Sequence, residues 1–113
     1  MKKDHLVFLT HILENIENIE SFSKNLSKKE LLDNLEKQYA IIRAVEIIGE
    51  AVKNIPLSLR EKYHSVKWNE IARTRDKLIH QYFGVDLNLL WDIIKTELPI
   101  LKKQIKNILE KES

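Results

Sequence analysis

The chain has 113 residues, of which 43% are hydrophobic and 32% are charged, a balance that predicts one packed domain and excludes a disordered segment. Cysteine is absent, which excludes disulfides, thiolate nucleophiles and thiolate metal ligands. The formal net charge of +2 is too small to indicate a nucleic-acid-binding protein by itself, so any electrostatic argument must be local.

Apolar residues recur at three- and four-residue steps over residues 4–22 and predict an amphipathic helix there. Ser27 and Glu30 then form a capping-box pattern, in which each side chain can satisfy a backbone donor of the other residue. A second helix should therefore begin at this point. We expect it to run for about 25 residues before Pro56, with a bend or interruption near Asn34.

The second half of the chain is predicted to hold three more helices. Pro56 suits the first turn of a short helix through residues 59–63, since its missing N–H would be unpaired there. A longer helix is predicted for residues 68–82, after which Gly84 can take a left-handed conformation and stop it. Asp86 is the predicted N-cap of the last helix.

Pro99 falls inside the apolar pattern of the last helix. Because the pattern continues beyond it, we expect a kink near residues 95–99 rather than an end. The chain contains only two glycines and two prolines, which leaves little turn chemistry for a sheet. Four substantial helices and a short one, joined by short loops, predict an all-α, up-and-down helical bundle that forms a single domain over residues 1–113.

Membrane insertion is not expected. No stretch of the chain approaches the roughly 20 apolar residues that span a bilayer. Near the start, Thr10, His11 and Glu14 interrupt any apolar run that could act as a signal sequence. We therefore expect a cytoplasmic protein with no membrane partner.

The segment from Arg75 to Asp86 carries polar groups that a simple helical bundle would not need. Asp76 and His80 are four residues apart, so on a continuous helix the carboxylate would meet and orient the imidazole. Arg75 and His80 are five apart, or about 140° around a regular helix. They can share one ligand only if the last turn tightens or a second copy of the chain contributes one of them.

The chemistry of this pair suits the cleavage of a phosphodiester without a metal. The arginine offers planar donors to a phosphate, and the histidine titrates near neutral pH. The competing interpretation is a satisfied surface or interface pair, since an arginine and a histidine at this spacing often occur by chance. Residues 60–80 contain six basic and three acidic residues, a local surplus that would attract RNA modestly.

Four stretches of the chain, in order, resemble one known family: residues 42–51, 68–72, 75–86 and 98–99. Together they are similar to the HEPN superfamily, and specifically to the HepT-like toxins that pair with minimal nucleotidyltransferase antitoxins. The motif of that family is an arginine, a polar residue, a short spacer, a histidine, any residue and a tyrosine. Arg75, Asp76, His80 and Tyr82 fill its four places.

The resemblance implies a metal-independent endoribonuclease toxin that uses no cofactor and acts as a homodimer. Arg75 and His80 of both subunits would line one cleft, with Asp76 in support. His80 would handle the proton of the attacking 2′-hydroxyl or of the leaving oxygen, and Arg75 would hold the phosphate. The antitoxin would transfer AMP from ATP to Tyr82 and so block the RNA site. Alternatively, the Tyr82 phenol stacks on a base or packs in the interface.

Two further alternatives stay open. The first is a catalytically silent HEPN helical module that docks a nucleotidyltransferase or a nucleotide. The second concerns Arg43, Glu46 and Glu50, which share one side of the second helix. The two glutamates could indicate a metal pair, but no histidine shares the helix, and an ion-pair row with Arg43 is the favoured interpretation. The resemblance implies that these three residues lie near the dimer cleft.

Overall fold

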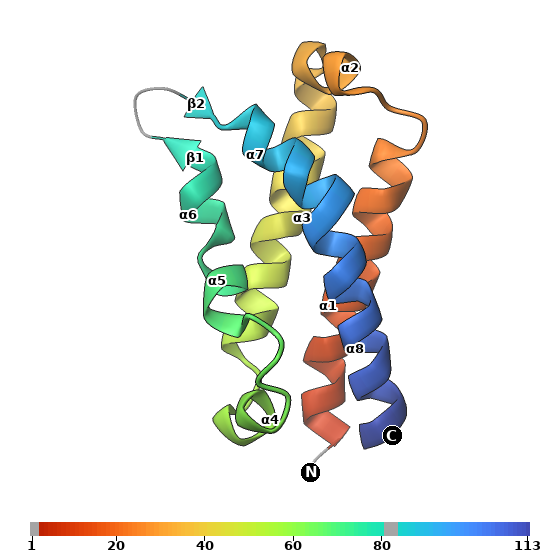
Figure 1. The fold of residues 1–113 in the computed structure, drawn as a ribbon, viewed down its shortest axis with the longest axis vertical. Coiled ribbons are helices and arrows are strands. Elements are labelled where there is room, and N and C mark those ends of the chain that lie inside the picture. The colour runs from red at the N-terminus through yellow and green to blue at the C-terminus, as the bar shows by residue number, and fades with distance from the viewer. Residues whose placement is uncertain (1–2, 81–83) are drawn as a thin grey trace.

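The computed structural model describes residues 3–80 and 84–113 and is almost entirely helical (Figure 1). The helices are α1 (Lys3–Ser23), α2 (Lys28–Asp33), α3 (Leu35–Lys53), α4 (Leu57–Lys62), α5 (Trp68–Ala72), α6 (Thr74–Leu78), α7 (Leu87–Asp92), the π-helix η1 (Ile93–Glu97) and α8 (Leu98–Glu112). Two short strands, β1 (Ile79–His80) and β2 (Gly84–Val85), form an antiparallel pair. The predicted all-α fold is confirmed.

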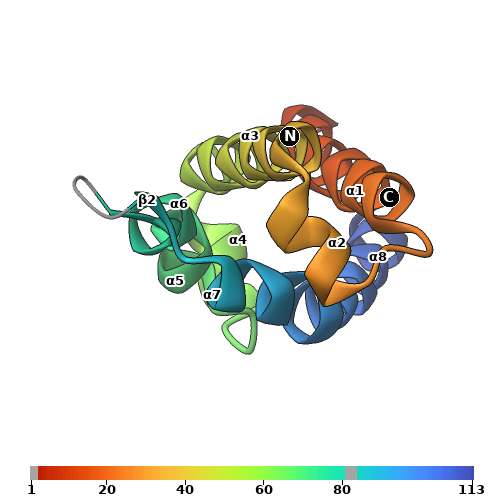
Figure 2. The ribbon, with the colours of Figure 1, turned by 90° about the horizontal axis from the view of Figure 1, so that it is seen from above.

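The long elements form a bundle around one apolar core. Helix α3 packs against α1 on one side and against α5 and α6 on the other, while α8 returns along α1. Viewed from above, α1, α3, α5–α6 and α7–α8 follow one another around a ring (Figure 2). Among the residues whose burial is described, twelve large side chains have almost no exposed surface: Leu9, Ile12, Ile16, Ile19, Leu31, Ile41, Val52, Ile55, Leu78, Leu90, Ile105 and Ile108.

The predicted cap and interruption in the first half of the chain are confirmed. The hydroxyl of Ser27 accepts from the Glu30 backbone N–H at 3.1 Å, and the Glu30 carboxylate accepts from the Ser27 N–H at 2.8 Å. The Ser27 backbone bond lowers the pKa of Glu30. Asn34 separates α2 from α3, and its side-chain oxygen caps α3 by accepting from the Lys37 N–H at 3.0 Å.

The predicted helix over residues 68–82 is wrong in two respects. The chain breaks at Arg73, which separates α5 from α6, and the helix ends at Leu78. Beyond that point Ile79 is extended and pairs with Val85, so the segment turns back as a hairpin. The reason is that β-branched residues on both sides favour extended backbone, while Gly84, at φ +79°, supplies the left-handed conformation to the hairpin instead of to a helix end.

The last helical segment follows the prediction closely. Asp86 caps α7, because its carboxylate accepts from the Leu89 N–H at 3.0 Å. The helix continues past Pro99, which is the second residue of α8, and the irregularity before the proline takes the form of the π-helix η1. The short helix α4 begins directly after Pro56, which is its N-cap rather than part of its first turn, and it ends at Lys62, one residue before the expected end at Tyr63. No helix within residues 3–80 and 84–113 combines the length and the apolar character needed to cross a membrane.

Candidate functional site

Helix α6 is placed beside α3 by a close approach of two backbones. Gly49 is buried in α3, and a Cβ atom built on it would lie only 3.3 Å from the Ala72 carbonyl oxygen at the end of α5. Most side chains at this position would push α5 away from α3. The glycine therefore sets the distance at which α6, the next helix, presents Arg75 to α3.

Arg75 makes its closest polar contact with α3. Its Nε donates to Oε2 of Glu46 at 2.9 Å, a charge-assisted hydrogen bond between residues 29 positions apart in the chain. Its Nη1 lies 3.7 Å from Oδ1 of Asp76, which is beyond hydrogen-bonding distance but within an ion pair. The arginine side chain is 47% exposed, so one edge of the guanidinium is held while part of it faces solvent.

Glu46 lies at the centre of a row of alternating charges. Its second carboxylate oxygen is 3.5 Å from Nη1 of Arg43, one turn earlier on α3, which confirms the predicted ion pair between these two residues. The row therefore runs Arg43, Glu46, Arg75, Asp76. Glu46 is the least exposed of the four, at 30%, against 69% for Arg43 and 76% for Asp76. Its interactions are accordingly the least screened by water.

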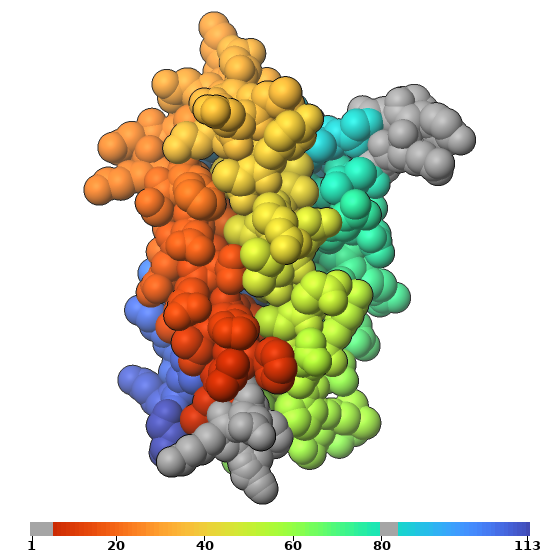
Figure 3. Space-filling model, turned by 180° about the vertical axis from the view of Figure 1, so that it is seen from behind, coloured from red at the N-terminus to blue at the C-terminus, as the bar shows by residue number. Residues whose placement is uncertain are grey.

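Glu50 stands apart from this row. It pairs with Lys53 at 3.4 Å, and its side chain is 70% exposed. Of the three candidate cleft residues on α3, the structure thus brings Arg43 and Glu46 to Arg75 and leaves Glu50 in a separate surface pair. Seen from behind, the outer surface of α3 lies between α1 and α6, where it is open to solvent (Figure 3).

His80 lies in β1, where its backbone pairs with Gly84; its side chain and all of Tyr82 lie outside the described residues. The helical neighbourhood assumed for Asp76 and His80 is wrong, because α6 ends at Leu78 and the two residues share no continuous helix. The described partner of Asp76 is Arg75 instead. Sequence periodicity could not have found this, since Leu78 and Ile79 fit a helical stripe as well as a strand.

The base of the hairpin is fixed to the bundle. The Asp86 backbone N–H donates to the Leu78 carbonyl oxygen at 2.7 Å, and Leu78 itself has no exposed surface. Ile79 and Val85 are half-buried against the core. The backbone that carries His80 therefore leaves the bundle from a defined point beside Arg75.

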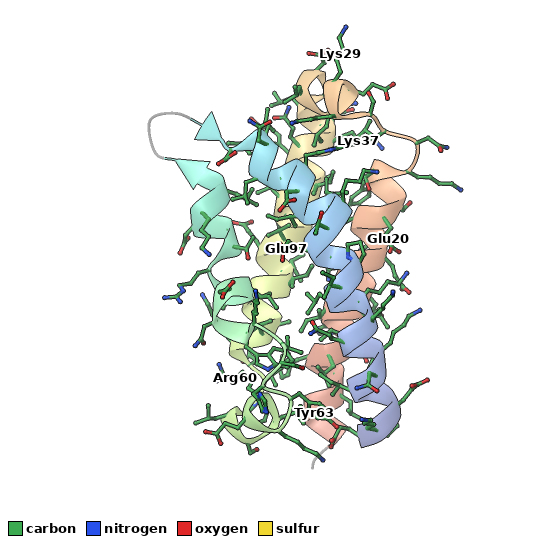
Figure 4. All side chains as sticks on the ribbon, viewed as in Figure 1. Glu20, Lys29, Lys37, Arg60, Tyr63 and Glu97 are labelled. Carbon is green, nitrogen blue, oxygen red and sulfur yellow. The ribbon has the colours of Figure 1, made fainter. Side chains whose placement is uncertain are left out.

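A groove that the sequence did not indicate lies between α5–α6 and η1–α8. It encloses about 340 Å³. Lys67, Glu70 and Lys77 line its α5–α6 side, and Asp92, the last residue of α7, lines the opposite side with Glu97 (Figure 4 labels Glu97). One side of the groove is formed by two short helices that are separated at Arg73, a break that periodicity alone did not reveal. Among the residues that the structure describes, no three acidic or histidine side chains gather closely enough to hold a metal ion.

Comparison with known proteins bears on this arrangement. The family described as Ribonuclease HepT-like matches residues 12–108. The chain belongs to this HepT-like family. The resemblance to HepT-like proteins inferred from the sequence is thereby confirmed, and the match includes both Glu46 and the motif from Arg75 to Tyr82. No solved structure matches the chain significantly.

Individual relatives agree with the family. A protein of Thermococcus cleftensis named "Probable ribonuclease HepT" is 44% identical over 96% of this chain and 98% of its own length. A "Putative RNase" of Caldanaerobacter subterraneus is 47% identical over 93% of this chain and 94% of its own. The "Gamma-glutamylcyclotransferase and putative RNase" of Methanocaldococcus jannaschii is 47% identical over 97% of this chain, which spans 50% of that longer protein.

Proposed function

We propose that this protein is a metal-independent endoribonuclease toxin that acts as a homodimer and cleaves cellular RNA in a cleft between the subunits. The observation that carries the proposal is the half-exposed Arg75, which lies in the first turn of α6, is held by Glu46 of α3 and is followed five residues later by His80. The HepT-like family and the ribonuclease names of close relatives support the same activity. The complete motif from Arg75 to Tyr82 lies within the family match.

Two residues carry the proposed chemistry. His80 accepts the proton of a ribose 2′-hydroxyl, whose oxygen attacks the adjacent phosphorus. The bond to the 5′-oxygen of the next nucleotide breaks, and that oxygen leaves after receiving a proton, so the products end in a 2′,3′-cyclic phosphate and a 5′-hydroxyl. Arg75 binds the phosphate and stabilises the negative charge that develops on it. Asp76, 3.7 Å from Arg75, supports the position of the guanidinium.

The proposed partner is a minimal nucleotidyltransferase that acts as the antitoxin in the cytoplasm. In this reaction the Tyr82 oxygen attacks the α-phosphorus of ATP, and pyrophosphate leaves. The AMP group adds a negative charge and bulk beside Arg75 and His80, where it competes with RNA. A homodimer would also double the local basic surplus of residues 60–80, which favours an RNA substrate in a salt-dependent way.

The main test compares growth inhibition and RNA cleavage by the wild type with those of Arg75→Ala and His80→Ala. Both variants should lose toxicity and cleavage. Lys106→Ala, which removes an exposed charge on α8, is the control and should retain both. Equal cleavage by wild type and both motif variants would exclude the proposed mechanism.

Tyr82 requires a separate experiment. Incubation with the nucleotidyltransferase and ATP should add the mass of one AMP to the wild type and none to Tyr82→Phe. Peptide mass spectrometry identifies the modified residue, and AMP on any other side chain would contradict the assignment.

The second candidate function is a catalytically silent module that docks a nucleotidyltransferase or a nucleotide. The groove between α5–α6 and η1–α8 favours it, because an apolar floor with charged walls suits a binding surface as well as an enzyme. Purified, unmodified protein that binds the nucleotidyltransferase but never cleaves RNA would establish this function instead.

A further inference from the structure

The guanidinium of Arg75 is anchored along one edge only. Within the described part of the chain, its single hydrogen bond joins Nε to Oε2 of Glu46 at 2.9 Å. The terminal nitrogens are directed elsewhere, with Nη1 at 3.7 Å from Asp76. A guanidinium can bind a phosphate through two parallel N–H groups at its outer edge. The observed contact therefore uses the inner donor and leaves the outer donors available.

Glu46 is well placed to act as a fixed anchor. It lies in the long helix α3, whose neighbouring positions Val45 and Gly49 are buried. Its second oxygen lies 3.5 Å from Nη1 of Arg43, so both oxygens of the carboxylate face a guanidinium. With a side chain 30% exposed, Glu46 is partly withdrawn from water, and its rotation is restricted on both sides.

We propose that Glu46 is a positioning residue that orients Arg75 for phosphate binding. The inference rests on the proposed ribonuclease function. By holding Nε, Glu46 fixes the direction of the outer guanidinium edge, so the arginine needs no reorientation when negative charge develops on the phosphate in the transition state. The arginine then acts through its direction at the reacting phosphate, more than through long-range attraction, because the adjacent carboxylate offsets much of its charge.

This role predicts that loss of the Glu46 carboxylate lowers kcat without raising KM. Glu46→Ala frees Arg75 and should lower kcat about two- to fivefold, the range expected for a partly exposed ion pair. The same change removes a negative charge near the RNA, so KM should stay the same or fall. Glu46→Gln keeps an oxygen that can accept from Nε and should recover part of the lost kcat.

Glu36→Gln is the matched control. It removes the same charge from an exposed side chain ten residues earlier on α3, outside the row formed by Arg43, Glu46, Arg75 and Asp76. It should leave kcat unchanged. A double-mutant cycle adds a second control, because Glu46→Ala should lower kcat no further in an Arg75→Lys background. If Glu46→Ala lowered kcat by the same factor in the Arg75→Lys background as in the wild type, the positioning role would be overturned.

A spectroscopic measurement tests the anchor without RNA. The Nε–H of Arg75, assigned by its loss in Arg75→Lys, should give a slowly exchanging ¹⁵N–¹H signal in the wild type and in Glu36→Gln, and should lose that protection in Glu46→Ala. Persistence of the signal in Glu46→Ala, with normal cleavage by the wild type, would overturn only the positioning role. If the wild type does not cleave RNA although its signal depends on Glu46, the proposed function is overturned. The contact between Arg75 and Glu46 then exists but has no catalytic role.

Discussion

Gly49 offers a direct test of how α3 and α5 set the position of Arg75. In the interior of a helix, glycine is less favourable than alanine by about 0.8–1.0 kcal/mol, so Gly49→Ala would ordinarily stabilise the protein by that amount. Here the added Cβ meets the Ala72 carbonyl oxygen at 3.3 Å, closer than an ordinary van der Waals contact. The oxygen belongs to the backbone and cannot rotate away, so α5 must move by a few tenths of an ångström.

The two effects are of similar size, and we expect them nearly to cancel. Urea unfolding should show Gly49→Ala within about 0.5 kcal/mol of the wild type. Gly49→Val adds two further carbons at the same contact and has a less favourable helix propensity than alanine. It should therefore destabilise the protein by about 1–3 kcal/mol, the range for an overpacked core.

The same substitution should affect the candidate site more than the fold. A shift of α5 carries α6 with it and lengthens the 2.9 Å contact between Arg75 and Glu46. The slow exchange of the Arg75 Nε–H should weaken in Gly49→Ala although the stability is almost unchanged. Two results together would refute the close approach of α3 and α5. Gly49→Ala would be more stable than the wild type by about 1 kcal/mol, and Gly49→Val would be as stable as the wild type.

Two further variants test the packing at the two ends of the bundle. Asp86→Ala removes the acceptor of the Leu89 N–H and should lower the unfolding free energy by about 1 kcal/mol, whereas Asp86→Asn should lose less; equal losses measured in urea would contradict the cap. Tyr63→Phe breaks the 2.6 Å hydrogen bond to Glu112 (Figure 4 labels Tyr63), which raises the pKa of Tyr63 above its ordinary value of 10.0. Because the folded pKa is raised, the wild type should be more stable than Tyr63→Phe below pH 10, and this advantage should disappear as the pH rises through the raised pKa. Thermal unfolding of both proteins at pH 7 and above pH 10 measures this difference in stability. A difference that grew with pH would contradict a stabilising hydrogen bond from Tyr63 to Glu112.

The helices could be predicted from the sequence because the signals that define them are local. Ser27 and Glu30 cap each other across three residues, and Asp86 caps α7 across three. The interruption at Asn34 and the continuation past Pro99 also follow from short-range chemistry. Each of these features depends on neighbours within one turn, so no knowledge of the rest of the fold is needed.

The hairpin and the arginine anchor could not be predicted because they depend on distant contacts. Leu78 and Ile79 continue the apolar pattern of a helix, and only the pairing of Ile79 with Val85 identifies a strand. The bond from Arg75 to Glu46 joins residues 29 positions apart and requires the close approach at Gly49. The sequence therefore identified Arg75 and Glu46 as candidate site residues, but it did not show that the two side chains contact each other.

The corrected backbone strengthens the reason to propose a cleft shared between two subunits. Side chains on a helix tilt toward its N-terminus, and the anchor on Glu46 holds Arg75 against α3. His80 lies two residues beyond α6 in extended backbone, where each residue advances the chain by about 3.3 Å. The backbone thus carries position 80 away from α6, and in the proposed dimer a second copy related by a two-fold axis would supply the partner that each residue needs.

Mixing two inactive variants tests this arrangement. If each site takes Arg75 from one subunit and His80 from the other, a mixed dimer of Arg75→Ala and His80→Ala chains contains one intact site. Unfolding and refolding the two variants together, in equal amounts, makes about half of the dimers mixed, so cleavage should return to about a quarter of the wild-type rate. Each variant refolded alone is the control and should stay inactive. If both residues of a site came from the same subunit, no mixed dimer would hold an intact site. Native mass spectrometry shows whether mixed dimers form, and a mixture that contains them but stays inactive would exclude the shared cleft.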